Sequence, residues 1–229
     1  MKTIGLIGGM SWESTVTYYE RINKTVNDQL GGLHSAKCVC VSVDFAEVEA
    51  AMAADDWRRC AQMMTTAGET LVRAGADFIV ICTNTMHKVA PEMQAALPVP
   101  ILHIAEVTAQ VLRQSGIEKT GLLGTRFTMQ EDFYTSVLKA NGVQVCLPDA
   151  DAQAMIDRVI FDELCHGIVS PDSKAAFLKV IDALVGAGAA GIVLGCTELG
   201  MLLAPEDTTV PLLDTALIHA EAAARAALV

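Results

Sequence analysis

The chain has 229 residues, of which 52% are hydrophobic and 19% are charged, and its formal net charge is −11. This length allows one large or two small domains, and the apolar content excludes a disordered chain. The negative charge argues against a nucleic-acid partner but leaves a small anionic substrate open. No apolar stretch approaches the roughly 18 residues of a spanning helix, so we expect no membrane insertion. The short apolar N-terminus is not typical of a signal peptide, which favours a cytoplasmic protein.

Short apolar runs alternate with longer segments of helical period along the chain. We predict strands at Thr3–Ile7, Cys38–Val43, Phe78–Ile81, Ile101–His103, Thr120–Leu123, Val143–Val145, Ile192–Leu194 and Leu212–Leu213. The helical segments between them include Ala46–Ala74, Glu106–Ser115, Gln130–Asn141 and Ser173–Ala187. Strands separated by helix-length segments predict βαβ units, and therefore an α/β fold with parallel sheets flanked by helices.

Three short strings recur in the same order and at nearly the same separation. The pairs are Leu6–Gly9 with Leu122–Thr125, Ala74–Val80 with Ala187–Val193, and Val99–Leu102 with Val210–Leu213. One such pair is expected by chance in an α/β protein, but three ordered pairs favour two copies of one α/β unit.

A cysteine follows equivalent strands of the two copies. Cys82 opens the string Cys-Thr-Asn-Thr after one strand, and Cys196 opens Cys-Thr-Glu after the other. Ligands of open α/β sheets bind at the carboxyl ends of the strands. We expect the Thr or Asn to cap a helix there, and the helix dipole to lower the thiol pKa from about 8.5 toward neutrality. If the copies face each other, the two thiols approach one cleft as a pair of bases.

Other interpretations of the cysteines remain open. Either thiol could be core filler, although equivalent positions in a repeat argue against this. The sequence support for a zinc site is weaker, because neither cysteine has a second Cys or His at ligand spacing. A Cys–His nucleophile could use His87 or His219. We expect structural roles for Cys38, Cys40, Cys60, Cys146 and Cys165, and the odd count of seven argues against a disulfide framework.

A glycine turn, Gly8–Ser11, follows the first strand. It matches neither the dinucleotide-binding fingerprint nor a P-loop, so it does not predict nucleotide binding. It either lets backbone approach a ligand or is a plain strand-to-helix turn, with Ser11 as the expected N-cap. Its counterpart in the second copy is Gly124–Thr128.

These residues together resemble a known family. The segment 79–88 resembles the first signature of the aspartate/glutamate racemases, and 192–202 resembles the second. The loop 8–14 is similar to the N-terminal loop of the aspartate racemase branch. The resemblance runs over essentially the whole chain.

The resemblance implies a cofactor-independent amino-acid racemase that uses neither pyridoxal phosphate nor a metal. It implies a homodimer of chains with two pseudo-symmetric α/β domains, residues 1–102 with 211–229 and residues 103–210, and an active site in the cleft between them. Cys82 and Cys196 would be the catalytic bases. The α-carboxylate and amine of the amino acid would be held by Thr83, Asn84, Thr85 and Thr197, with Met10 and Thr125 in loops over it.

Substrate range is the point at which the sequence departs from the family pattern. Members specific for aspartate typically have a lysine in the segment that here is Phe161–Gly167, and this segment has none. We therefore expect specificity beyond aspartate. Two alternatives stay open, an isomerase or decarboxylase of a small carboxylic acid and a non-catalytic amino-acid-binding protein. The presence of both cysteines favours the racemase over either.

Overall fold

The computed structural model describes residues 1–229. The chain divides into two compact units, Met1–Ile104 with His219–Val229 and Ala105–Ile218. Each unit contains a four-stranded parallel sheet, ordered β2-β1-β3-β4 in the first and β6-β5-β7-β8 in the second. The predicted α/β class is confirmed, and the matching strand orders agree with the sequence repeat. None of the helices has both the length and the apolar character that crossing a membrane requires.

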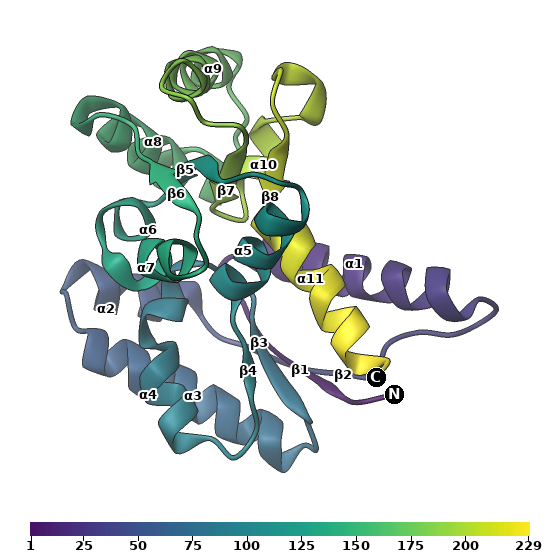
Figure 1. Ribbon diagram of the computed structural model, residues 1–229. Coiled ribbons are helices and arrows are strands. Elements are labelled where there is room, and N and C mark those ends of the chain that lie inside the picture. Colours follow the sequence, from purple (N-terminus) through teal and green to yellow (C-terminus); the bar gives the residue numbers. More distant parts are fainter. The chain divides into compact units, whose positions relative to one another are not determined.

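The strands of the first unit are β1 (Ile4–Gly8), β2 (Cys38–Ser42), β3 (Phe78–Ile81) and β4 (Ile101–Leu102). The two central strands, β1 and β3, are buried along their whole length. Their sequences are continuous apolar runs because helices cover both faces of the sheet. Figure 1 shows these strands lying side by side in the lower half of the view.

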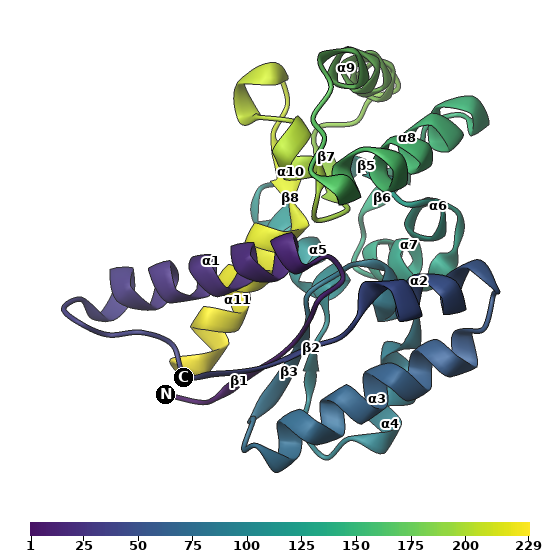
Figure 2. The same cartoon turned by 180° about the vertical axis from the view of Figure 1, so that it is seen from behind.

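Helices pack on the two faces of this sheet. The helices α1 (Trp12–Leu30) and α11 (Thr215–Ala227) lie together on one face, and α3 (Trp57–Arg73) and α4 (Ala90–Ala96) on the other (Figure 2). An ion pair between Arg21 and Glu221 joins α1 to α11. The C-terminal helix is thereby fixed to the N-terminal half of the chain.

The expected helical segment 46–74 is wrong as one element, because the chain forms α2 (Phe45–Ala53) and α3 with a break between them. Asp55 in the break has φ +56°, a left-handed conformation that Asp tolerates. The carboxylate of Asp56 accepts a hydrogen bond from the backbone N–H of Arg59 at 3.0 Å and starts α3. Apolar residues continue on both sides of the break, so their period did not reveal it.

The strands of the second unit are β5 (Lys119–Gly124), β6 (Gln144–Cys146), β7 (Ile192–Gly195) and β8 (Leu212–Asp214). Its helices are α5 (Ile104–Gln114), α6 (Arg126–Gln130), α7 (Asp132–Ala140), α8 (Ala150–Asp162), α9 (Pro171–Gly186) and α10 (Leu199–Leu202), with 3-10 turns at Leu164–His166 and Pro205–Asp207. A buried core that includes Phe177, with no exposed surface, joins α8 and α9 to β5 and β7.

The outward face of α1 carries large apolar side chains at helical spacing. Trp12, Val16 and Tyr19 are each more than half exposed. The other tryptophan, Trp57, is half-buried at the start of α3, and the Lys88 ammonium lies 3.6 Å from the centre of its ring. Both tryptophans belong to the first unit, which includes Met1–Ile104.

Candidate active site

The first unit gathers its predicted site residues at one edge of the sheet. β1 and β3 are neighbours whose register pairs Ile7 with Ile81, so the loops that follow them leave the sheet together. The backbone N–H of Cys82 donates to the carbonyl of Ile7 at 2.9 Å, which extends the ladder by one residue. Met10 and Cys82 are both buried there.

The glycine turn after β1 depends on a position that only glycine fits. Gly9 has φ +95°, and a Cβ built on it would lie 2.2 Å from the carbonyl oxygen of Val43. Its N–H donates to Oγ1 of Thr15 at 2.8 Å. Ser11 accepts a hydrogen bond from the N–H of Ser14 and caps α1, as predicted. The turn therefore packs closely against the end of β2 and holds Met10 at the sheet edge.

The segment after Cys82 is more tightly wound than expected. Thr83 is half-buried, Asn84 and Thr85 are buried, and the chain then forms a 3-10 turn at Thr85–Val89. No side chain caps this turn. The expectation that Thr or Asn acts as an N-cap is wrong here, and the same holds for α10, which Glu198 precedes without a side-chain cap.

The second unit repeats the arrangement with β5 and β7. Their register pairs Gly124 with Gly195, and Thr125 and Cys196 follow these residues directly. A Cβ on Gly124 would lie 2.9 Å from the carbonyl oxygen of Gly195, so the two strand ends touch through backbone. Thr125 and Cys196 are buried, and Thr125 caps α6 by accepting from the N–H of Thr128.

Glu198 is a site residue for which sequence reasoning found no role. Its Oε2 lies 3.0 Å from Sγ of Cys196, which donates to it, and 2.8 Å from the Thr197 hydroxyl, which also donates. The residue is only 4% exposed. Its place two residues after the cysteine was visible in the motif. Carboxylates are rarely buried, however, so the motif alone did not indicate that Glu198 lies beside the thiol.

Both thiols have a raised pKa, which contradicts the expected lowering by a helix dipole. Burial is the main cause at Cys82, and the nearby thiols of Cys40 and Cys38 add to it. Burial is also the main cause at Cys196, and Glu198 adds to it. The following helical turns are short, five residues at Thr85–Val89 and four at α10, so their dipoles are small compared with the desolvation of a thiolate.

Neither His87 nor His219 is available as a partner for a nucleophilic cysteine. His87 donates from Nδ1 to the carbonyl of Thr83 at 2.9 Å and accepts at Nε2 from the N–H of Ile104 at 3.2 Å. His219 donates from Nε2 to the carbonyl of Leu102 at 2.8 Å and accepts at Nδ1 from the Tyr18 hydroxyl at 2.9 Å. All four ring nitrogens are occupied, so the Cys–His alternative does not fit this geometry.

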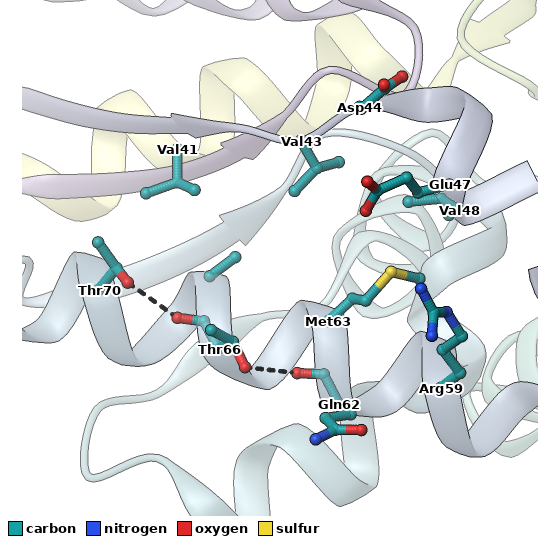
Figure 3. Close-up of a pocket in the computed structure, with 11 residues that line it drawn as sticks. Val41, Val43, Asp44, Glu47, Val48, Arg59, Gln62, Met63, Thr66 and Thr70 are labelled. Carbon is teal, nitrogen blue, oxygen red and sulfur yellow. Dashed lines mark hydrogen bonds between the residues drawn. The ribbon is translucent and has the colours of Figure 1, made fainter.

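Two further observations concern metal-binding clusters and a cavity beside β2. Nowhere do three or more His, Cys, Asp or Glu side chains converge to hold a metal ion. A cavity of about 490 Å³ opens between β2, α2 and α3. Val41 and Val43 form one wall of it, and Thr66 and Thr70 of α3 form the other (Figure 3). None of the predicted site residues lines it.

Comparison with known proteins identifies the family. The family model of the Asp/Glu/Hydantoin racemases matches residues 7–223. The chain belongs to this family.

Individual relatives agree with this assignment. The broad specificity amino-acid racemase RacX of Bacillus subtilis (strain 168) is 32% identical over 148 residues, which are 63% of this chain and 62% of RacX, less than two thirds of that protein. The crystal structure of "a putative Asp/Glu Racemase from Yersinia pestis" has a TM-score of 0.93 at 50% identity. An aspartate racemase homologue from Pyrococcus horikoshii OT3 has a TM-score of 0.87 at 30% identity. Both structural matches cover 100% of each chain.

Proposed function

We propose that this protein interconverts L- and D-amino acids without a cofactor and uses Cys82 and Cys196 as two bases. The supporting observation is that a buried thiol stands at the same place in each of two sheets with one strand order. Racemisation needs a base on one face of the α-carbon and an acid on the other. Two equivalent thiols in a member of a racemase family meet that need.

In the proposed reaction one cysteine, as thiolate, takes the α-proton, and the other, as thiol, gives a proton to the opposite face. The roles exchange with the direction of reaction. Burial opposes the thiolate, and the ammonium group of a bound amino acid supplies positive charge that favours it. At Cys196, Glu198 accepts the thiol proton and leaves the thiolate. Backbone N–H groups after each cysteine are suited to stabilise the carbanionic intermediate, at about 3–4 kcal/mol for a good donor.

The proposal assigns the substrate contacts to polar side chains beside each thiol. Thr83, Asn84 and Thr85 follow Cys82, and Thr197 follows Cys196. We infer that these hold the α-carboxylate and amine, with Met10 and Thr125 in the loops over the substrate. Similarity to RacX, which is named for broad specificity, supports a range beyond aspartate. A homodimer in the cytoplasm is part of the same proposal, and the exposed apolar face of α1 is a surface that a second copy would bury.

The direct test incubates purified protein with a panel of L-amino acids and follows D-isomers by chiral chromatography. Dialysis against EDTA and hydroxylamine should leave the activity intact, because no step uses a metal or a carbonyl cofactor. Loss restored by an added cofactor would refute the mechanism. Cys82→Ala and Cys196→Ala should each lose racemisation by several orders of magnitude. Cys60→Ala, which removes a buried thiol from α3, is the matched control and should keep it.

A substrate with a β-leaving group separates the two thiols, because elimination discharges the carbanion without reprotonation. Cys82→Ala and Cys196→Ala should each eliminate from one enantiomer only, with opposite preferences. The family resemblance suggests that Cys82 acts on the D form and Cys196 on the L form. If both variants prefer the same enantiomer, or if either keeps near-normal racemisation, the two-thiol mechanism fails.

A further inference from the structure

We propose that His87 is a positioning residue that fixes the Cys82–Thr83 backbone by tying Thr83 to the chain at Ile104. This inference rests on the proposed role of Cys82 as a base. His87 lies five residues after that cysteine and is 1% exposed.

The hydrogen bonds of His87 allow only one neutral tautomer. The backbone N–H of Ile104 can only donate, so Nε2 must be the unprotonated acceptor at 3.2 Å. The carbonyl of Thr83 can only accept, so Nδ1 carries the proton and donates at 2.9 Å. A second ring proton would break the bond to Ile104. The pKa of His87 accordingly lies well below its usual value, with burial as the main cause and His103 and His219 adding to it.

The carbonyl that His87 holds belongs to the residue directly after the candidate base. On the other side of Cys82, its own N–H is bound to the carbonyl of Ile7 in β1. The backbone N–H of His87 also donates to the carbonyl of Asn84 at 3.0 Å. Ring and backbone of one residue therefore fix two successive carbonyls after Cys82.

Neighbouring rings keep the imidazole in place. The ring centroids of His87 and His103 are 4.7 Å apart, and those of His87 and His219 are 5.6 Å apart. His219 is itself held by the Tyr18 hydroxyl and the Leu102 carbonyl. Leu102–Ile104 is where the chain leaves the first unit, and His219 is where it returns. His87 thus connects the Cys82 loop to the two crossing points of the chain.

Because both nitrogens are used in this way, His87 has neither a proton nor a lone pair to offer Cys82. It acts through the backbone and not as a base. A misplacement of about 1 Å at a reacting group can cost about a hundredfold in rate. Loss of the His87 bonds is therefore expected to affect the Cys82 half of the reaction and to spare the half that depends on Cys196.

The test measures elimination from both enantiomers of the β-chloro form of the amino acid that the wild-type enzyme racemises fastest. His87→Phe, which keeps a ring and loses both bonds, is combined separately with Cys196→Ala and Cys82→Ala. His87→Asn is made in the same backgrounds, because its amide can still donate to the Thr83 carbonyl. His34→Phe, at an exposed loop histidine, is the matched control. Circular dichroism and unfolding curves establish that each variant is folded.

In the Cys196→Ala background, where Cys82 is the remaining base, His87→Phe should lower kcat for elimination at least about tenfold. His87→Asn should recover most of that loss. If the Phe variant does not fold, the smaller loss that His87→Asn retains without the Ile104 bond, confined to the Cys196→Ala background, decides the question. In the Cys82→Ala background neither substitution should change kcat by more than about twofold. Equal losses in both backgrounds, or no loss in either, would overturn the positioning role. If the single cysteine variants themselves fail to show opposite enantiomer preferences, it is the two-thiol mechanism that fails, and the role of His87 falls with it.

Discussion

Oε2 of Glu198 lies 3.0 Å from Sγ of Cys196, inside a shell that leaves the carboxylate almost no contact with solvent. The groups that act electrostatically on Cys82 are instead the thiols of Cys40 and Cys38. The two candidate bases therefore stand at equivalent strand ends in different surroundings. The two directions of the proposed reaction should differ in how they respond to pH and to mutation.

Replacing Glu198 by Gln tests this difference. Glu198 raises the pKa of Cys196, so its neutralisation should lower that pKa and move the rising limb of the Cys196-dependent pH profile to lower pH. The plateau rate should change by no more than about twofold, because on the plateau the thiol has already lost its proton and needs no acceptor. Elimination assays in the Cys82→Ala and Cys196→Ala backgrounds measure both effects. Glu206→Gln, at an exposed position, is the control, and an unchanged Cys196 profile would contradict the assignment.

The buried histidines should make the free energy of unfolding depend on pH in the acidic range. Burial lowers the pKa of His219 to about 4, whereas the unfolded chain titrates near its ordinary value of 6.5. Between these values the unfolded state binds more protons, so the free energy of unfolding should fall as pH drops from about 6.5 to about 4. The loss from His219 should approach about 3 kcal/mol, and His87 should add to it.

Denaturant unfolding at several pH values through this window measures the slope. His219→Gln removes one titrating group, so it should be less stable at neutral pH but lose less stability on acidification. A His219→Gln variant with the same pH slope as the wild type would show that the histidine does not contribute.

Gly9 and Gly32 form a matched pair for backbone strain. Both have positive φ, but a Cβ on Gly9 would lie 2.2 Å from Val43 O, whereas nothing lies within 4 Å of one on Gly32. Gly32→Ala should cost about 1 kcal/mol for its left-handed conformation alone. Gly9→Ala should cost about 3 kcal/mol or more, and should also lower activity because it displaces Met10. Equal losses in thermal unfolding would contradict the close approach.

Substrate range should reflect the missing lysine in Phe161–Gly167. Neutral as well as acidic amino acids should be turned over, and aspartate as the sole substrate would contradict this inference. Arg126, exposed at the start of α6, is a cation that could bind a distal carboxylate. Arg126→Ala should then lower kcat/KM for acidic substrates about tenfold and leave neutral ones nearly unchanged. Steady-state kinetics on both classes measure the split.

Strand positions were predictable because each strand is a short apolar run between polar or glycine-rich turns. Phe78–Ile81 was predicted to the residue, and each of the other strands differs from its prediction by one residue at one or both ends. The break at Asp55 was missed because a left-handed aspartate interrupts the helix without interrupting its apolar period. The spacing of apolar residues indicates which face of a helix is buried, but it does not indicate which single residue adopts a left-handed conformation and ends the helix.

The site was predictable only in part. The recurrence of Cys-Thr after equivalent strands singled out the two thiols as candidates. Parallel pairing explains why the loops with Met10 and Cys82 leave one sheet at the same edge, and those with Thr125 and Cys196 the other. The predicted lowering of the thiol pKa values was wrong. Burial, which is a property of the folded chain, raises them by more than the dipoles of two short helical turns can lower them. The hydrogen-bond partners of Glu198 and His87 could not be predicted, because residue spacing alone does not show which groups a side chain contacts in the folded chain.

The position of the two tryptophans makes the two units optically distinguishable. Trp12 and Trp57 both lie in the first unit, and the chain has no other tryptophan. Indole fluorescence therefore reports on the unit that contains Cys82. Quenching by acrylamide, which is uncharged, should affect the exposed Trp12 more than the half-buried Trp57. Far-ultraviolet circular dichroism reports on both units. Unfolding curves from the two signals coincide if the units melt together, and separate if Cys196 sits in a part of the chain that opens on its own.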